Sequence, residues 1–173
     1  LAVPLVPPTD MHREVFRQYF TRNGLSIKEL SVNHGGFIAH VPETLITECL
    51  VHCFNVTKLV LDFGWNGTFL DIVNSSCPRL QSLHMTNFSP NGIYSLNSPD
   101  RLVFAELTAL HVEDGILSKD VVTFLAKVMP HLESLSLKYS RFEANEWPKL
   151  RHLDLHSTFV LDSVWPHLNQ LAS

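Results

Sequence analysis

The feature that most constrains the fold is a short pattern of leucines that recurs along the chain. Each copy has an apolar residue, then leucine three positions later, then another apolar residue after two more positions. The six copies occupy residues 27–32, 56–61, 80–85, 107–112, 132–137 and 150–155, and a partial seventh opens at 168. The last two apolar positions are two residues apart, so they share one face of an extended strand. Copies that start 18 to 29 residues apart therefore predict an array of equivalent strands.

Residues 115–137 show the repeating unit in its most regular form. Apolar residues recur there at the i, i+3, i+4, i+7 spacing of an amphipathic helix, at Val121, Phe124, Leu125 and Val128. Ser118 is a suitable N-cap, and Pro130 disfavours helical backbone at Met129, so we expect the helix between them. The unit thus runs from a turn through a helix and a proline to a strand.

A proline-bearing lead-in precedes several of the strands. It spans residues 77–80, 129–132, 147–150 and 165–168, and the first of these reads Cys-Pro-Arg-Leu. With this lead-in, 115–137 resembles the cysteine-containing class of leucine-rich repeats, whose units run turn, helix, Cys-Pro-x-Leu, strand. Residues 45–59 and 69–78 resemble the same helix and stop.

This repeat class is best known from the F-box substrate receptors of cullin ubiquitin ligases, and it is also similar to ribonuclease inhibitor. The resemblance covers roughly residue 25 to the end of the chain. It implies an α/β solenoid with a parallel concave sheet of about six strands and helices on the convex side. The chain departs from the class in three ways: it shows no F-box pattern, only Cys77 precedes a proline, and the last two units are too short for a full helix.

We divide the chain into an N-terminal extension with a capping helix, residues 1–24, and a leucine-rich repeat domain, residues 25–173. The proline-rich residues 1–9 are expected to run extended over the surface. A helix follows from Met11 to about Thr21, closed by Asn23 and Gly24. Its expected apolar face is Val15, Phe16, Tyr19 and Phe20. Either it covers the open edge of the first strand, which we favour, or it is the tail of an adaptor-binding module.

Later elements follow the same logic. We expect helices at 42–53 and near 68–75, and an irregular loop at 89–100, where prolines, glycine and serines are frequent. In the short last units, Trp147, Phe159 and Trp165 are expected to supply the bulk that helices give elsewhere. Residues 44–49 also resemble the start of a motif that binds elongin adaptors, with Cys53 at its last position, although any repeat helix has the same spacing.

Composition limits the class of protein. The formal net charge is −4, with mixed signs, whereas a nucleic-acid partner would require a basic stripe. No apolar run approaches the roughly 20 residues that cross a bilayer, so we expect no membrane association. Three cysteines do not make a disulfide framework, and Cys49 and Cys53 are expected to face the core. We favour a cytoplasmic or nuclear protein, although four N-x-S/T sequons, at Asn55, Asn66, Asn74 and Asn87, leave secretion open.

The polar residues of the strands predict a binding surface. Residues between the buried leucines point to the concave face, where equivalent positions of neighbouring strands lie side by side. The middle row is Ser31, Val60, His84, His111, Ser136 and Asp154. Aromatic residues that follow the strands are further candidates: Phe63, Phe88 and Phe142 are expected in the core, whereas Trp65 and Tyr139 are candidate exposed anchors. The candidate partner-binding residues are Trp65, His84, His111, Glu113, Lys138, Tyr139, His152, Asp154 and His156.

The same residue types also suit two other uses, a metal site and a pH-sensitive contact. His84, His111 and Glu113 have the ligand types of a metal site, but a solvated polar face explains them as well, and a pH-sensitive contact between the imidazoles is favoured over a metal. We therefore expect no metal and no cofactor. No nucleophile elbow, phosphate loop or zinc-protease motif is present, so we do not expect an enzyme.

The function expected from the sequence is protein recognition through the concave sheet and its flanking loops. By the family resemblance, this would be the substrate-binding or adaptor part of a ubiquitin-ligase-type complex, with other proteins as partners and a cullin-ligase adaptor as one candidate among them. The alternatives are a structural or assembly subunit of a larger complex, and a secreted glycosylated recognition domain.

Overall fold

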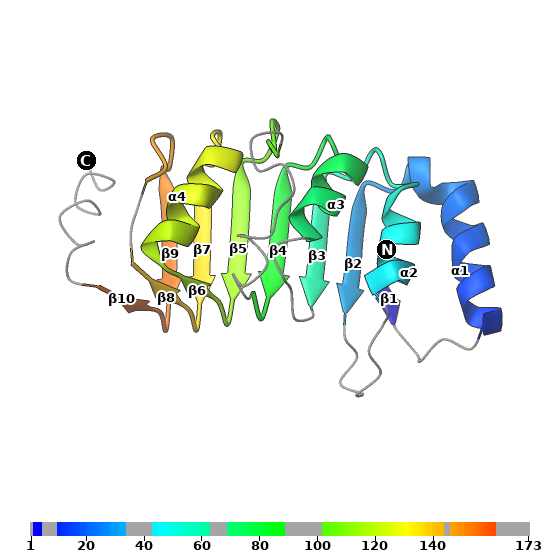
Figure 1. Cartoon of the computed structure of the whole chain (residues 1–173), viewed down its shortest axis with the longest axis horizontal. Helices are drawn as coiled ribbons and strands as arrows, with labels where there is room; N and C mark the ends of the chain where they lie inside the picture. The colour runs from blue at the N-terminus through cyan, green and yellow to red at the C-terminus, as the bar shows by residue number, and fades with distance from the viewer. Residues whose placement is uncertain are drawn as a thin grey trace.

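The protein has an α/β fold built on one parallel sheet (Figure 1). A computed structural model describes residues 2–4, 10–33, 43–62, 69–88, 102–143 and 146–161. The strands of the large sheet lie in the order β1-β2-β3-β4-β5-β7-β9, and every neighbouring pair is parallel. Their bounds are β1 (Ala2–Pro4), β2 (Glu29–Asn33), β3 (Lys58–Asp62), β4 (Ser82–Thr86), β5 (Ala109–Glu113), β7 (Ser134–Lys138) and β9 (His152–His156). Strands β2, β3, β4, β5, β7 and β9 lie on the six sequence patterns, which confirms the α/β class and the parallel sheet.

The seventh strand, β1, differs from what the sequence suggested. The proline-rich lead was expected to run over the surface, but its residues 2–4 pair with β2, with Ala2 opposite Ser31 and Pro4 opposite Asn33. An edge strand tolerates proline because one side of it makes no ladder hydrogen bonds. The lead therefore extends the sheet by one short strand.

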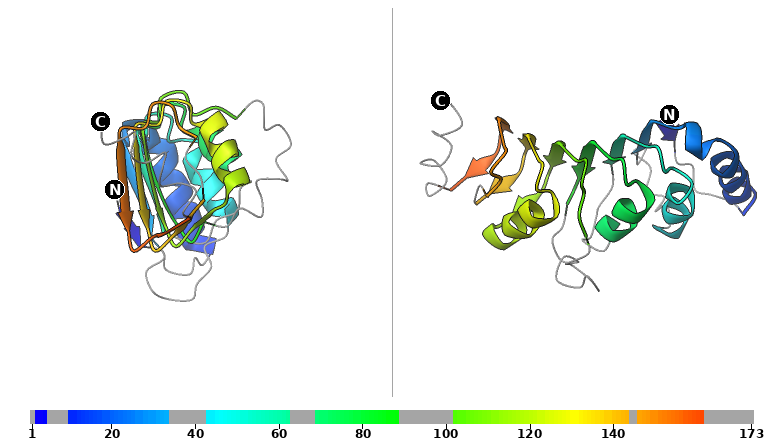
Figure 2. Two further views of the ribbon diagram at one scale, coloured as in Figure 1. Left: turned by 90° about the vertical axis from the view of Figure 1, so that its left-hand side faces the viewer. Right: turned by 90° about the horizontal axis from the view of Figure 1, so that it is seen from above.

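The helices in the described ranges are α1 (Asp10–Asn23), α2 (Glu43–Leu50), α3 (Phe69–Ser76) and α4 (Lys119–Val128), with a 3₁₀ turn η1 (Gly24–Ser26) after α1. Helices α2, α3 and α4 lie along one face of the sheet, and α1 packs beside α2 at its end (Figures 1 and 2). A second parallel sheet consists of short strands that come after β5, β7 and β9 in the chain. They are β6 (Ile116–Leu117), β8 (Arg141–Phe142) and β10 (Phe159–Val160). Residues 134–143 and 146–161 contain no helix, as their length predicted.

The same hydrogen bonds recur before each strand. In a tight turn, the backbone N–H of the first apolar residue of each pattern donates a hydrogen bond to the carbonyl three residues earlier. Examples are the bonds from Leu80 to Cys77 at 3.1 Å and from Leu132 to Met129 at 3.3 Å. The next residue bonds to the equivalent residue of the preceding unit: Gln81 N–H donates to the Thr57 carbonyl at 2.8 Å. Backbone hydrogen bonds thus connect each new turn to the previous one, so the sequence can vary while the register stays constant.

The backbone also turns in the same way after the strands. The residue that follows β4, β5, β7 and β9 has a positive φ of 52° to 55° in each case. These residues are Asn87, Asp114, Tyr139 and Ser157. Asparagine and aspartate adopt this left-handed conformation readily, whereas tyrosine does so at a cost.

The core is a column of stacked leucines between the sheet and the helices. Leu59, Leu83, Leu110 and Leu135 lie directly opposite one another in adjacent strands, and their exposed fractions are 0%, 0%, 2% and 0%. They belong to a buried cluster that extends from Phe20 to Leu150. The column arises because the leucine of each pattern always faces the helices.

Several local expectations were wrong. In α1, Phe20 is buried, but Val15 is 61% and Tyr19 is 41% exposed, because α1 lies at the end of the array and buries only a narrow stripe against α2. Helix α1 does end at Asn23, as expected, but Asn23 keeps a negative φ of −115° and the chain continues as η1 instead of adopting the left-handed conformation that Asn and Gly tolerate. Ser118 does precede α4, but its hydroxyl makes no capping hydrogen bond.

The expectation that bulky residues fill the core of the last units is correct for one of them and wrong for another. Trp147 is buried, as expected, but Phe159 is 62% exposed, because β10 is the outer strand of the small sheet. Trp165 and the loop at 89–100 lie outside the described residues.

Candidate functional site

The large sheet presents one face without helices, which we call the open face. Seen from above, it is the inner side of a gently curved sheet, with α2 to α4 on the other side (Figure 2, right). Its side chains alternate with the buried leucines, so most are half-buried or exposed. The described open-face residues are Glu29, Ser31, Lys58, Val60, Asp62, Ser82, His84, Thr86, Ala109, His111, Glu113, Ser134, Ser136, Lys138, His152, Asp154 and His156.

The rows expected from the sequence are present in the register. In the middle row, Val60 pairs with His84, His84 with His111, His111 with Ser136, and Ser136 with Asp154. The open-face positions two residues before and after this row pair in the same way, with Ser134 opposite His152 and Glu113 opposite Lys138. Side chains that are some 25 residues apart in sequence thus meet across the sheet.

The centre of the open face is a cluster of His84, His111 and Glu113. The imidazole rings of the two histidines meet edge-on, with 4.0 Å between centroids and 75° between planes. One nitrogen of each histidine and one carboxylate oxygen of Glu113 all lie within 4.8 Å of one another. Nε2 of His84 is buried and has no hydrogen-bond partner in the described part of the chain. In the tautomer that leaves Nε2 unprotonated, this nitrogen can accept a hydrogen bond or bind a metal ion.

Electrostatics keep these histidines neutral. Burial lowers the pKa of His84 below its ordinary value, and the adjacent His111 lowers it further because two neighbouring imidazolium ions repel. Burial likewise lowers the pKa of His111, against the opposing effect of Glu113. Both rings therefore keep a free lone pair at neutral pH.

A charged group borders this cluster. Lys138 Nζ donates a hydrogen bond to Glu113 Oε1 at 2.7 Å. This bond lowers the pKa of Glu113 and raises that of Lys138 from their ordinary values. The same ammonium lies 5.0 Å from the ring centroid of Tyr139. The Tyr139 ring in turn meets the His156 ring edge-on, with 6.0 Å between the ring centroids. Glu113, Lys138, Tyr139 and His156 therefore form a continuous polar and aromatic strip.

Other open-face residues are also fixed by neighbours. Thr86 Oγ1 donates to Asp62 Oδ1 at 2.9 Å, and Ser136 Oγ donates to Asp154 Oδ2 at 3.3 Å. These bonds were not anticipated, although the row assignment already placed Ser136 beside Asp154. A surface whose side chains are held in place loses less entropy when a partner binds.

The predicted site residues are placed as follows. His84, His111, Glu113 and Lys138 are half-buried and adjacent, whereas His152, Asp154 and His156 are exposed on the edge strand β9. Tyr139 is 53% exposed, as its candidate role requires, and Phe88 and Phe142 are buried, as predicted. Trp65 and Phe63 lie outside the described residues.

The cysteines are not part of this surface. Cys49, Cys53 and Cys77 are free thiols in the core. Burial raises the pKa of Cys49 to about 12, of Cys53 to about 11 and of Cys77 to about 12. Because Cys49 and Cys53 face the core, the segment that resembled an elongin-binding motif does not present them to a partner.

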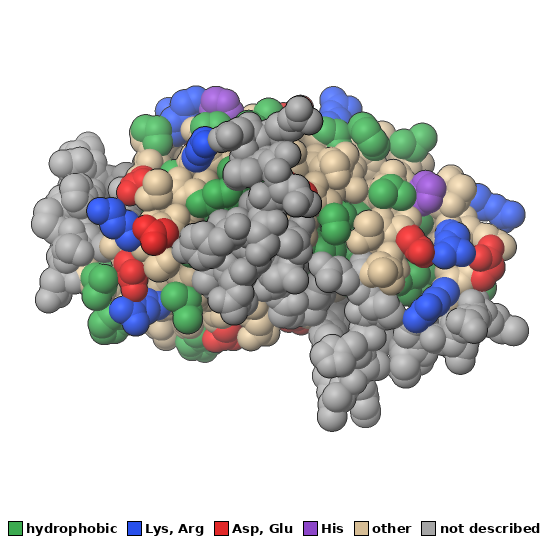
Figure 3. All heavy atoms as spheres, viewed as in Figure 1, with side chains coloured by type: hydrophobic (Ala, Val, Ile, Leu, Met, Phe, Trp, Pro, Cys, Tyr) green, Lys and Arg blue, Asp and Glu red, His purple; other side chains and the backbone are tan. Residues whose placement is uncertain are grey.

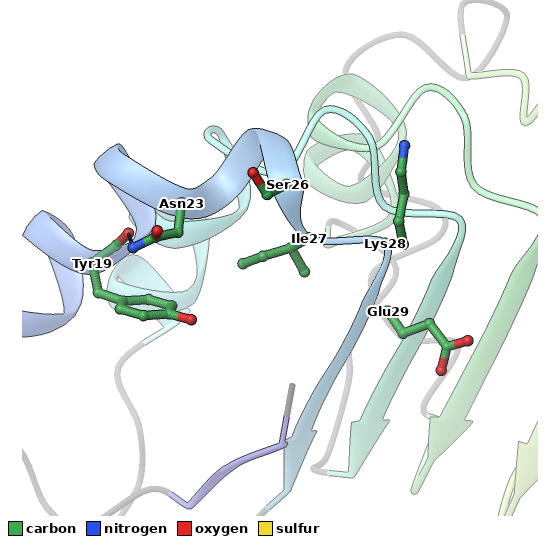
Figure 4. Close-up of a pocket in the computed structure, with 6 residues that line it drawn as sticks. All are labelled: Tyr19, Asn23, Ser26, Ile27, Lys28 and Glu29. Carbon is green, nitrogen blue, oxygen red and sulfur yellow. Dashed lines mark hydrogen bonds between the residues drawn. The ribbon is translucent and has the colours of Figure 1, made fainter.

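A hollow of about 510 Å³ lies at the other end of the sheet, between α1, η1 and the start of β2 (Figure 4). Its lining residues are Tyr19, Asn23, Ser26, Ile27, Lys28 and Glu29. The Asn23 side chain donates a hydrogen bond to the Tyr19 carbonyl at 3.0 Å, which satisfies that amide within α1. Among these residues only Lys28 and Glu29 carry charge, so the hollow lacks the convergent groups found at the centre of the open face.

The helix-bearing side shows no comparable feature among its described atoms. Basic and acidic side chains are intermixed at both ends of the view, without a patch of one sign (Figure 3). None of the described helices combines the length and the apolar character needed to cross a bilayer.

Comparison with known proteins does not place the chain in a family. No protein-family model matches the sequence, and no curated protein matches it significantly. The features of the open face are therefore the basis for the function of this chain.

Proposed function

We propose that the chain is a protein-recognition module, a short solenoid of leucine-rich repeats that binds a partner protein on its open face. The recurrent turn and inter-unit hydrogen bonds and the stacked leucine column support the repeat assignment. The observation that carries recognition is the open face itself, a row of ordered polar side chains that none of the described helices covers. Stacked repeats offer such a surface without further machinery.

The partner surface is centred on β5, β7 and β9. Here Glu113, Lys138 and Tyr139 form the ordered strip, and His152 and Asp154 extend it to the sheet edge. The strip combines an aromatic side chain with charges of both signs, the composition that gives binding surfaces their anchors and their specificity. We place the module in the cytoplasm or nucleus, which agrees with three reduced cysteines.

We further propose that this module is the substrate-binding or adaptor part of a ubiquitin-ligase-type complex. The support is the resemblance of residues 115–137 to the cysteine-containing repeats of F-box receptors. The buried positions of Cys49 and Cys53 argue against elongin binding through α2, so an adaptor would have to bind elsewhere.

Affinity capture with matched charge reversals tests recognition. Asp154→Lys changes an exposed open-face residue, and Glu106→Lys makes the same charge change in an exposed turn before β5. Partners read by mass spectrometry should be retained by the wild type and by Glu106→Lys but lost by Asp154→Lys. Equal capture by both variants would contradict binding at the open face. Recovery of a cullin adaptor with the intact protein tests the ligase assignment separately.

One observation favours an assembly subunit as the second candidate. Leu153 and Leu155 of β9 are only half-buried, whereas the matching Leu135 and Leu137 of β7 are fully buried. Partly exposed core positions at a sheet edge suit a permanent neighbour. Sedimentation at micromolar concentration separates the two candidates, because a recognition module remains a monomer and an assembly subunit associates or aggregates.

A further inference from the structure

The cluster at the centre of the open face has the composition of a metal site. Its two imidazoles and one carboxylate are ligands that Zn²⁺ prefers, and three protein ligands leave one coordination position free. The three candidate ligand atoms are within 4.8 Å of one another. In a tetrahedral site with metal–ligand bonds of about 2.0–2.2 Å, small side-chain rotations would bring them to coordination distance.

A second observation points to a ligand for His84. His84 Nε2 is inaccessible to solvent and has no hydrogen-bond partner among the described residues. Buried polar nitrogens are normally satisfied, because an unmade hydrogen bond carries a desolvation cost. Coordination of this lone pair to a cation would remove that cost.

We propose that His84, His111 and Glu113 bind one Zn²⁺ ion on the open face. The fourth position faces away from the core and is taken by water or by a side chain of a bound protein. The two histidines come from neighbouring strands β4 and β5, and Glu113 lies two residues after His111 on the same side of β5, so all three ligands stand on rigid backbone. The site does not depend on the proposed recognition function.

Lys138 is the built-in competitor of the metal. Its ammonium donates a hydrogen bond to Glu113 Oε1 at 2.7 Å. The positive charge of this ammonium also repels a cation at the site and so weakens cation binding. Removing this charge while keeping the length of the side chain, as in Lys138→Met, frees the carboxylate. If the two histidines bound zinc without Glu113, the zinc affinity would increase much less on that substitution, because Lys138 is hydrogen-bonded to Glu113.

Calorimetric titration of ZnCl₂ into the chelator-treated chain, without a histidine tag, tests the proposal. We expect one Zn²⁺ per chain with micromolar or tighter affinity, weakened at least about tenfold by His84→Gln, His111→Gln or Glu113→Gln. His152→Gln, a change at an exposed open-face histidine outside the cluster, should leave the affinity unchanged. Lys138→Met should tighten binding severalfold.

Circular dichroism of each variant ensures that only folded proteins are compared. Affinity limited to the millimolar range, or an equal loss with His152→Gln, would overturn the site. Unchanged affinity in both Glu113→Gln and Lys138→Met would equally overturn it, because the carboxylate would then not be a ligand. For the folded variants, X-ray absorption of the zinc complex should show both imidazoles in the coordination shell of wild type and one in His84→Gln.

Discussion

The ammonium of Lys138 lies 5.0 Å from the centroid of the Tyr139 ring, and this contact accompanies an unusual backbone. Tyr139 has φ 52°, in the left-handed region that asparagine, aspartate and serine occupy at the equivalent positions of neighbouring units. A bulky residue adopts this conformation at a cost of roughly 1–2 kcal/mol. Residues in sparsely populated backbone regions cluster at functional sites, so this strain supports the proposed role of Tyr139 in partner binding.

Tyr139→Asn should therefore stabilise the fold. Relief of the left-handed strain is worth about 1 kcal/mol, against about 0.5 kcal/mol lost with the exposed contact to Lys138. Urea unfolding measures the difference. Asp114→Asn, at φ 55° in the preceding unit, is the control and should change stability by less than about 0.5 kcal/mol. A clear loss of stability in Tyr139→Asn would show that the ring has a packing role.

Leu83→Ala tests the leucine column. Leu83 is fully buried between Leu59 and Leu110, so the change leaves a cavity and should lower the free energy of unfolding by about 2–5 kcal/mol. Val60→Ala, on the open face of the adjacent strand, should cost less than about 1 kcal/mol in the same urea titration. Similar losses in the two variants would contradict the assignment of the two faces.

Ser140→Ala tests a buried hydroxyl that joins two units. Its oxygen accepts from the Gly115 N–H at 3.1 Å and donates to the Lys138 carbonyl at 3.0 Å. Without it the Gly115 N–H is left unsatisfied in the interior, which should cost about 1–3 kcal/mol by chemical unfolding. Ser134→Ala, on the half-buried open face, is the matched control and should be nearly neutral. If both serine variants unfold alike, the hydrogen bond is not structural.

Gly24→Ala tests the packing of η1 against the turn after α2. A Cβ atom at Gly24 would lie 2.4 Å from the backbone oxygen of His52, so the chain must shift. We expect a loss of about 1–3 kcal/mol, seen as a lower thermal midpoint. Ser26→Ala changes an exposed residue of the same turn and should be neutral. An unchanged midpoint in Gly24→Ala would show that this end of the fold adapts freely.

The cysteines should be unreactive in the folded chain. Burial raises their thiol pKa to between about 11 and about 12, above the 9.0 of a free thiol, so the reactive thiolate is nearly absent at pH 8. Iodoacetamide should modify none of the three in native buffer and all three in urea, as counted by mass spectrometry. Rapid native alkylation of Cys49 would contradict its position in the core.

The sequence alone determined six strands of the large sheet and their register. A period-two pattern of leucines, repeated six times, permits only one set of residues to face the core, and it therefore places His84 beside His111. It also predicted the burial of Phe88 and Phe142, since apolar residues just after a strand must fill the turn.

Only the tertiary structure decided features that depend on neighbours distant in sequence. The pairing of residues 2–4 with β2, the exposure of Val15 and Phe159, and the turn of Asn23 into η1 depend on what lies beside each element, which local patterns do not encode. The tertiary structure also decides the side-chain rotamers that bring the candidate ligand atoms of His84, His111 and Glu113 within 4.8 Å of one another. A repeat pattern specifies which side chains share a face, whereas packing between units specifies where their atoms meet.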